Sequence, residues 1–474
     1  MPRPWLLRRW CVPDLAFATA CVTLFYCLFL FQGYQQLFRD SDAGWHIRTG
    51  EAILSTGSLP RSDPYSFTRA GQPWFAWEWL SDVAVGGIHR SLGLRGVALF
   101  YAAAIAAGVW LWFRLHWAMG GNFLLACAMA PLLLSTCSIH WLARPHVLSW
   151  ILLLLAVFPR KPNLLVVAVV SALWANLHAS FFLAPVIALL FALEDRWYLK
   201  AAVVSALAPL CNPYGPQLCV HVFRYLTDSD LLSRVAEFQS FDFHSPGSAQ
   251  ILATVIVGVV GGTLALTVGR RHHFALAILI TAMALRSARA LPLSALLLLP
   301  IANAAITRSL REGGVLVGRA VWPAGFLAYA DNLRTLDRSF HGLALAPLVL
   351  IAAFRLMPAA AFPADQFPVA AYPYIPTDAR LFAPDKFGGY LIYRSGGAIK
   401  VFFDGRSDLY GADFLKRYSR MVQIRPGWQA HWDSFHFTHA LLPADAPLLP
   451  ALEQLGWRAL YRDKTATLLV VPGT

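Results

Sequence analysis

Charged side chains are scarce in this sequence of 474 residues. They make up 14% of the chain, whereas an ordinary soluble domain carries about 25%. Apolar residues account for 57% of the total, and their excess is confined to residues 1–357. The composition therefore excludes a soluble globular enzyme. It predicts a multispan membrane domain over 1–357 and a soluble domain over 358–474.

Lysine is also rare, because it supplies only six of the 39 basic residues and the rest are arginine. The formal net charge of +13 would suit nucleic acid, anionic lipid or the positive-inside bias of a membrane protein. Many of the arginines stand in short loops between apolar runs, which favours the last interpretation. We therefore expect contact with membrane lipid and no nucleic-acid partner.

Cysteine pairs are absent from the sequence. The seven cysteines lie in or beside apolar segments, no two of them form a CxxC pair, and none falls in residues 358–474. This pattern supports neither a disulfide framework nor a thiolate zinc site. The soluble domain must therefore be stable without disulfides.

Long apolar runs, in contrast, are abundant. A membrane-crossing helix needs about 20 mostly apolar residues, and fewer where neighbouring helices cover a short or broken one. By this measure we predict about eleven spans. They cover 15–38, 94–114, 122–138, 147–158, 163–177, 181–193, 199–212, 250–268, 274–287, 290–306 and 342–357. The predicted fold class is a polytopic α-helical membrane protein with a small C-terminal α/β domain.

Basic residues indicate the orientation of these spans. With the N-terminus in the cytoplasm, every loop predicted to be cytoplasmic carries arginine or lysine, as the positive-inside rule requires. The residues concerned are Arg114, Arg160, Lys161, Arg196, Lys200, Arg270, Arg271, Arg308, Arg311 and Arg319. An odd number of spans then places the soluble domain outside the cytoplasm. We expect a protein of the bacterial inner membrane with a periplasmic C-terminal domain.

Polar clusters gather on the predicted outer side, at 40–46, 143–146, 174–178, 211–215 and 286–289. Ionisable groups at membrane spans are costly and usually mark a site. One cluster alone could equally be a helix cap or an interfacial anchor, but five on one face predict a shared outer cavity. The residues expected to line it as donor or acceptor contacts are Arg144, His146, Asn176, His178, Asn212 and Tyr214.

Asp40 and Asp42 stand on either side of one residue at the end of the first span. Two uses remain open for this pair. The carboxylates could hold a hard divalent cation, Mg²⁺ or Mn²⁺, through oxygen ligands, or one could take a proton from an acceptor while the other orients it. An exposed acidic loop start is the simpler alternative. Zinc held by two histidines and an aspartate is disfavoured, since the ligands would lie on different spans with no spacing that connects them.

The first outer loop, residues 39–82, has its own structural signals. Trp45, Thr49, Ala52 and Ile53 share one face of a predicted helix that ends at Gly57, a natural helix stop. We expect this helix to lie flat on the membrane. The later tryptophans, Trp74, Trp77 and Trp79, suit the lipid headgroup layer.

The segment DSDAGWHIRTGEAILSTGSLPRSDPYSFTRAGQPW, residues 40–74, resembles the first outer loop of GT-C glycosyltransferases. It is most similar to that of oligosaccharyltransferase catalytic subunits. The matching positions are an acidic residue at the end of the first span, Asp40 or Asp42, followed by His46, Gly57 and the Asp63-Pro64 element. The resemblance implies transfer of a sugar from a polyprenyl phosphate or pyrophosphate donor on the outer face of the membrane.

A second similarity follows the last predicted span. DKFGGYLIYRSGGAIKVFFDGRSDLYG, residues 385–411, is similar to the corresponding segment of oligosaccharyltransferases, but KFGGY at 386–390 replaces the acceptor-reading WWDYG signature. We therefore expect an acceptor other than an asparagine sequon, and its identity remains open.

The resemblance also implies roles for individual residues. Asp40 is the preferred base and Asp42 its rival. Arg286 and Arg289, in a context resembling the family's RF-x-x-x-x-P segment, suit the donor phosphate through their forked donors. His46, Asp404 and Arg406 are further candidates for substrate binding, with Asp408 beside them; packing or turn capping is the alternative for the last three.

Two other classes of protein compete with a glycosyltransferase. A transporter would be expected to carry polar residues near the bilayer midplane on broken helices within repeated halves, and neither is evident. A non-catalytic scaffold or a lipid-linked glycan polymerase could share a multispan core. The ordered first loop, with its acidic start, and the terminal soluble domain favour the transferase.

Hydrophobic periodicity predicts the elements of the soluble domain. We expect strands at 390–394, 399–405 and 439–443, helices at 412–424 and 448–456, and a closing hairpin over 457–471. Asp404 and Arg406 would then lie at the end of the second strand, where a loop could face the membrane cavity.

Overall fold

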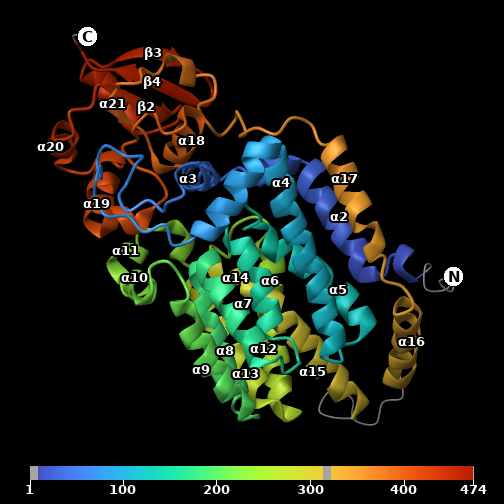
Figure 1. The fold of residues 1–474 in the computed structure, drawn as a ribbon. Coiled ribbons are helices and arrows are strands. Elements are labelled where there is room, and N and C mark those ends of the chain that lie inside the picture. Colours follow the sequence, from blue (N-terminus) through green and yellow to red (C-terminus); the bar gives the residue numbers. More distant parts are fainter. Residues whose placement is uncertain (1–8, 313–321, 473–474) are drawn as a thin grey trace.

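The computed structural model describes residues 9–312 and 322–472. A bundle of helices forms one part of the molecule, and the C-terminal region is stacked against one end of it (Figure 1). The bundle contains α2 (Leu15–Phe29), α4 (Trp79–Ala118), α5 (Phe123–Ser138), α6 (His146–Ala156), α7 (Leu164–Leu177), α8 (Leu183–Phe191), α9 (Trp197–Leu207), α12 (Ser248–Thr267), α13 (Arg271–Arg286), α14 (Leu291–Leu293), α15 (Leu299–Arg311) and α17 (Ala346–Leu356).

Each predicted span overlaps a helix of this bundle. Four helices in the described part of the chain are long and apolar enough to cross a membrane: Arg9–Phe29, Trp79–Ala118, Ser248–Thr267 and Ala288–Arg311. Six further apolar helices are shorter, at 10–17 residues, and would need cover from their neighbours. The total of about eleven spans stays a prediction. Arg319, one of the basic residues used to orient the chain, lies outside the described residues.

Two features of the bundle were not predicted. Helix α4 begins at Trp79, well before the expected limit of 94, and contains one residue with non-helical backbone at Gly93, where φ is 63°. An additional helix, α16 (Trp322–Asp337), lies between the last two predicted spans and contacts α5 and α15.

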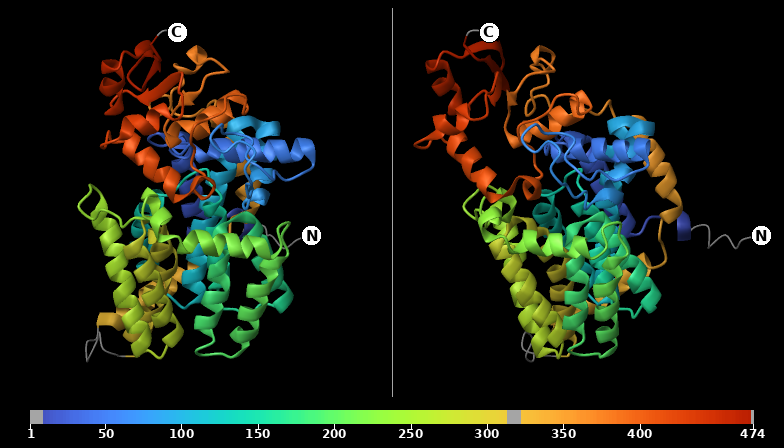
Figure 2. Two further views of the ribbon diagram at one scale, coloured as in Figure 1. Left: turned by 90° about the vertical axis from the view of Figure 1, so that its left-hand side faces the viewer. Right: turned by 60° about the vertical axis from the view of Figure 1, so that its left-hand side comes forward.

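The first outer loop folds as predicted around a helix, α3 (Asp42–Thr56), which ends at Gly57 with a left-handed backbone at φ 65°. Figure 2 shows α3 running across the end of the bundle rather than along it. It packs against α4 on one side and against α18 (Asp385–Ser395) on the other. The last contact is close, because a Cβ atom on Gly44 would lie 2.2 Å from the carbonyl oxygen of Gly389.

The Asp63-Pro64 element closes the turn that follows α3. The Asp63 carboxylate accepts hydrogen bonds from the backbone N–H groups of Tyr65 (3.1 Å) and Ser66 (2.9 Å). Its Oδ1 atom also lies 2.8 Å from Nη1 of Arg406, and both side chains are buried. This ion pair ties the first outer loop to the C-terminal region.

The three tryptophans at the end of this loop make contacts with distant parts of the chain. Trp74 is only 4% exposed, and the Arg406 guanidinium lies 4.6 Å from its ring centroid. Trp77 packs edge-on against the ring of Tyr225, and Trp79 donates a hydrogen bond to Asn176 Oδ1 at 2.7 Å. The interfacial interpretation is wrong for Trp74, because long-range contacts with the C-terminal region cover it.

The C-terminal region contains a four-stranded sheet of order β1-β2-β4-β3 within the described residues. Strand β1 (Leu381–Phe382) is parallel to β2 (His439–Pro443), and β4 (Ala466–Val470) pairs antiparallel with both β2 and β3 (Arg458–Arg462). The helices around the sheet are α18, α19 (Ser407–Val422), α20 (Trp428–Asp433) and α21 (Leu448–Gln454). The strand at 439–443, both helices and the closing hairpin are confirmed. The domain boundary at 357 stays a prediction.

Two predicted strands of this region are wrong. Residues 390–394 belong to α18, whose buried positions Phe387, Tyr390 and Leu391 follow the spacing of a helical face. Residues 399–405 are not a sheet strand and form a single bridge, between Val401 and Ser66 of the first outer loop. The aromatic and β-branched composition suited strands, but tertiary contacts decided the outcome.

Candidate active site

A cavity of about 1320 Å³ lies where the loops at one end of the bundle meet the C-terminal region. Residues from four of the five polar clusters line it, and only 211–215 contributes none. The sequence-predicted candidates that line the cavity are Asp40, Asp42, Arg144, His146, His178, Arg286, Arg289 and Arg406.

Other predicted candidates support the wall instead of lining the cavity. The Nδ1 atom of His46 lies 2.5 Å from Oδ1 of Asp82, and both side chains are buried. Asn176 accepts the Trp79 hydrogen bond and donates to the carbonyl oxygen of Cys211 at 3.0 Å. The Tyr214 hydroxyl donates to the carbonyl oxygen of Ala76 at 3.4 Å. Asn212 caps its own turn through the carbonyl oxygens of Pro209 and Gly215.

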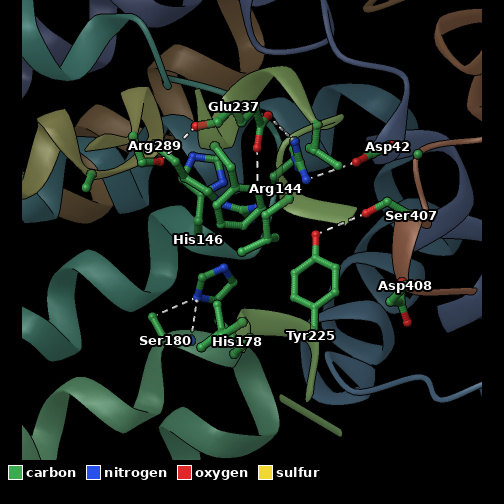
Figure 3. A pocket seen from close by; sticks show the side chains of 18 of the residues that line it. Asp42, Arg144, His146, His178, Ser180, Tyr225, Glu237, Arg289, Ser407 and Asp408 are labelled. Atoms are coloured by element: carbon green, nitrogen blue, oxygen red, sulfur yellow. Dashed lines mark hydrogen bonds and ion pairs between the residues drawn. The ribbon is translucent and has the colours of Figure 1, made fainter. Parts of the chain in front are cut away.

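Arg144 is the centre of a group of three carboxylates (Figure 3). Its Nη1 atom lies 2.8 Å from Oδ2 of Asp40 and 2.7 Å from Oε1 of Glu237, and its Nη2 atom lies 2.9 Å from Oδ2 of Asp42. Burial, and then the neighbouring Asp40 carboxylate, raise the pKa of Asp42 to about 8, although Arg144 opposes this rise. Asp42 is therefore mostly protonated at neutral pH.

Glu237 was not predicted from the sequence. It lies on the short turn η4 (Ala236–Phe238), and its Oε2 atom is 3.3 Å from Nη1 of Arg289. Burial raises the pKa of Glu237, but the guanidinium groups of Arg144 and Arg289 outweigh burial and hold the pKa below its usual range. Glu237 therefore links the two arginines as an ionised carboxylate, as Figure 3 shows.

Glu78 is a second carboxylate that sequence reasoning missed. It lies in the cavity wall beside α4, with Oε1 3.5 Å from Nε2 of His178 and Oε2 3.7 Å from Nε2 of His46. Burial raises its pKa to about 7. Glu78 can therefore gain or lose a proton near neutral pH.

His178 faces Glu78 in a defined tautomer. Its Nδ1 atom accepts a hydrogen bond from the backbone N–H of Ser180 at 3.2 Å. Burial, and then Arg289, lower the pKa of His178 well below its usual value, so the ring is neutral. Nδ1 is an acceptor, so the single ring proton is on Nε2 and points toward Glu78.

The loop 404–408 closes the cavity from the C-terminal side. Asp404 does not line the cavity; it holds the buried Arg406 through Oδ1 to Nε (2.8 Å) and Oδ2 to Nη2 (2.7 Å). Gly405 packs on Asp42 so tightly that a Cβ atom there would lie 2.0 Å from the carboxylate Oδ1. The loop therefore fixes the position of Asp42. Asp408, at the end of this loop, lines the cavity, and its Oδ2 atom lies 3.2 Å from Nε2 of His221.

A divalent cation does not fit the predicted pair of ligands. The Arg144 guanidinium lies against both Asp40 and Asp42, where the ion would have to bind. No group of three or more histidine, cysteine or acidic side chains in residues 9–312 and 322–472 is placed to hold a metal ion. The oxygen atoms that would coordinate Mg²⁺ or Mn²⁺ are engaged by nitrogen donors instead.

Comparison with known proteins shows the fold. Neither a protein-family model nor a curated protein matches the sequence. Among solved structures, the oligosaccharyltransferase AglB from Archaeoglobus fulgidus, in complex with an inhibitory peptide and a dolichol-phosphate, aligns with a TM-score of 0.51. The alignment covers 91% of this chain and 69% of AglB at 10% identity. This chain therefore has a fold similar to that of the archaeal oligosaccharyltransferase AglB.

Two further structures of the Archaeoglobus fulgidus oligosaccharyltransferase agree. The apo form aligns with a TM-score of 0.51 and 12% identity, covering 91% of this chain and 69% of that enzyme. The form tethered to an acceptor peptide with an NVT sequon aligns with a TM-score of 0.51 and 11% identity, covering 94% and 70%. The shared fold therefore extends across both the helix bundle and the C-terminal region, as the resemblance of the first outer loop implied.

Proposed function

We propose that this protein is a membrane glycosyltransferase that moves a sugar from a polyprenyl phosphate or pyrophosphate to an acceptor on the outer face of the membrane. The observation that carries this proposal is the cavity in which carboxylates and arginines from distant segments meet, in an oligosaccharyltransferase fold. The reaction needs both kinds of group. A carboxylate can accept the proton of the acceptor, and an arginine can bind the phosphate that leaves.

The donor phosphate is assigned to Arg289, with Arg286 beside it. Both line the cavity, and a guanidinium offers two parallel N–H donors to phosphate oxygens. Arg289 is held toward the cavity by Glu237 at 3.3 Å. The dolichol-phosphate bound to AglB, which has a similar fold, supports a lipid-linked donor of this class.

The reaction is a single displacement at the anomeric carbon. The acceptor group attacks that carbon, the bond to the phosphate oxygen breaks, and the acceptor proton passes to a carboxylate. Asp40 is the preferred base. Its Oδ1 atom accepts the backbone N–H of Asp42 at 2.9 Å and its Oδ2 atom binds Arg144, so the carboxylate is held in one orientation. Asp42 is the rival, although it can accept a proton only where the pH approaches about 8.

The acceptor is proposed to differ from an asparagine sequon. The segment KFGGY forms the first half of α18, and its glycines pack against backbone from two directions. A Cβ atom on Gly389 would lie 2.3 Å from the carbonyl oxygen of Ser41, and one on Gly388 would lie 2.0 Å from that of Phe403. The position has no room for the larger side chains of WWDYG.

A donor-consumption assay tests the proposal. Purified protein is incubated with a panel of polyprenyl-linked sugars, and loss of the intact donor is followed by mass spectrometry. We expect one donor class to be consumed by the wild type and not by Arg289→Gln. Donors that bind without being consumed, across a full panel of acceptors, would favour a non-catalytic scaffold or transporter instead.

A further inference from the structure

We propose that Arg144 takes the place of a divalent cation between Asp40, Asp42 and Glu237, so that the site binds no such ion. The consequence for catalysis, transfer without a divalent metal, rests on the proposed function. The claim about ion binding stands by itself and can be tested without an assay of transfer.

Three carboxylates from two segments far apart in the sequence point at one guanidinium, and all three distances fall between 2.7 and 2.9 Å. Figure 3 shows Arg144 between Glu237 on one side and Asp42 on the other. The Arg144 side chain is only 14% exposed. The guanidinium therefore occupies the centre of the acidic group and is not a neighbour at its edge.

Carboxylates that share a site cannot all ionise unless a positive charge lies between them. Arg144 supplies one such charge to all three carboxylates and Arg289 supplies another to Glu237. The two arginines therefore bring to this group of carboxylates the two positive charges that a divalent ion would supply.

Mg²⁺ requires oxygen ligands at about 2.0–2.1 Å in octahedral geometry, and the carboxylate oxygens nearest the centre already bind Nη1 and Nη2 of Arg144. The backbone next to Arg144 is also anchored, since the N–H of Ala143 donates to the carbonyl oxygen of Leu37 at 2.8 Å. An ion could enter only if the Arg144 side chain left the site.

Binding of Mn²⁺ alone tests this inference. Purified wild type, Arg144→Ala and Arg286→Ala are titrated with Mn²⁺, and bound ion is measured by electron paramagnetic resonance. Arg144→Ala leaves three carboxylates without their cation, so it should bind Mn²⁺ at least tenfold more tightly than the wild type. Adding Glu237→Gln to the Arg144→Ala protein should abolish this gain in Mn²⁺ affinity. Arg286→Ala removes a guanidinium from the same cavity and should gain nothing.

Two results would overturn the inference. One is wild-type Mn²⁺ binding that Asp40→Asn or Glu237→Gln removes, and the other is an Arg144→Ala protein that binds no more Mn²⁺ than the wild type. If Arg144→Ala does not fold alone, it is purified in Mn²⁺ and its thermal unfolding midpoint is measured with and without the ion. A midpoint that Mn²⁺ raises in the variant and not in the wild type supports the inference. A variant midpoint that is the same with and without Mn²⁺ rejects it. Wild-type donor consumption that survives a chelator supports the catalytic consequence. A protein that consumes no donor defeats the proposed function and leaves the Mn²⁺ result to decide the rest.

Discussion

The Oε1 atom of Glu78 lies 3.5 Å from Nε2 of His178, and both residues are less than a tenth exposed. Neither residue pairs with an arginine in the ion pairs of the described chain. Glu78 thus differs from Asp40, Asp42 and Glu237, whose carboxylates Arg144 engages directly. Burial is the main cause that raises the pKa of Glu78. Arg289 and Arg144 oppose this rise, and Asp408 and Glu237 add to it.

Glu78 should make stability depend on pH. Burial raises its pKa from 4.5 to about 7 in the folded protein, so the folded state binds more protons than the unfolded state between these values. The stability that Glu78 contributes is present below pH 4.5 and is lost as the pH rises to about 7. The loss is on the order of 3 kcal/mol.

Thermal unfolding in detergent checks this prediction. In Glu78→Gln the thermal unfolding midpoint should decrease less between pH 4.5 and 7 than it does in the wild type. In Glu453→Gln, in the C-terminal region, the decrease should equal that of the wild type. Identical curves for wild type and Glu78→Gln would show that Glu78 is ionised throughout the range.

Asp40→Asn should abolish transfer and leave donor binding near normal. Asparagine keeps the shape of the side chain but does not accept the acceptor proton, and a positioned base contributes about 10²- to 10⁴-fold. Asp242→Asn, at an exposed carboxylate in an outer loop, is the matched control. Full turnover in both Asp40→Asn and Asp42→Asn would remove the catalytic assignment and leave both residues with a structural role.

Arg289→Lys should weaken donor binding on the order of tenfold, because lysine keeps the charge and loses the paired N–H donors. Binding of a polyprenyl phosphate, measured by tryptophan fluorescence, is the readout. Arg308→Lys, at a half-exposed position on α15, should bind the lipid as the wild type does. Unchanged binding in the double variant Arg286→Gln, Arg289→Gln would assign the arginines to a structural role.

Gly405→Ala should lower turnover at least tenfold, an effect expected when a catalytic carboxylate is misplaced. The added Cβ atom would lie 2.0 Å from Asp42 Oδ1, so either the loop or the carboxylate must shift. Gly325→Ala, where a Cβ atom would meet nothing within 4 Å, controls for the change itself. Wild-type turnover in Gly405→Ala would mean that the position of Asp42 is unimportant.

The C-terminal region should lie outside the cytoplasm. Helix α12 begins near cavity-lining Ser240 and has 20 residues, a length of about 30 Å, so Arg270 lies at the opposite end of the bundle. A reporter that is active only in the periplasm should work when fused after Thr474 and fail near Arg270. The reverse pattern would place the cavity on the cytoplasmic face.

The helix bundle could be predicted from the sequence because apolar runs are a local signal. The clusters around Asp40, Arg144 and Arg289 could also be found, since charged residues beside apolar runs are conspicuous. Glu237 could not, because it stands in a polar loop where an acidic residue is ordinary, and only the folded chain brings it to Arg144.

Errors in the C-terminal region have the same origin. Residues 390–394 have strand-like composition, but contacts with α3 hold them as part of a helix. Trp74 suited a membrane interface until Arg406, more than 300 residues later, covered its ring. Glu78, four residues from Trp74, was not predicted as a site residue because it stands in the same tryptophan-rich segment. Contacts between distant segments decide these positions, and the local sequence does not record them.

The buried ion pair of Asp63 with Arg406 joins two residues that are synthesised at widely different times during translation. Gly405 and Asp408 complete the cavity that Asp40 begins, so an early product of translation has an open, incomplete site. The catalyst that we propose is therefore assembled only after synthesis has passed Asp408. Donor lipid in the surrounding bilayer meets no working enzyme during that interval.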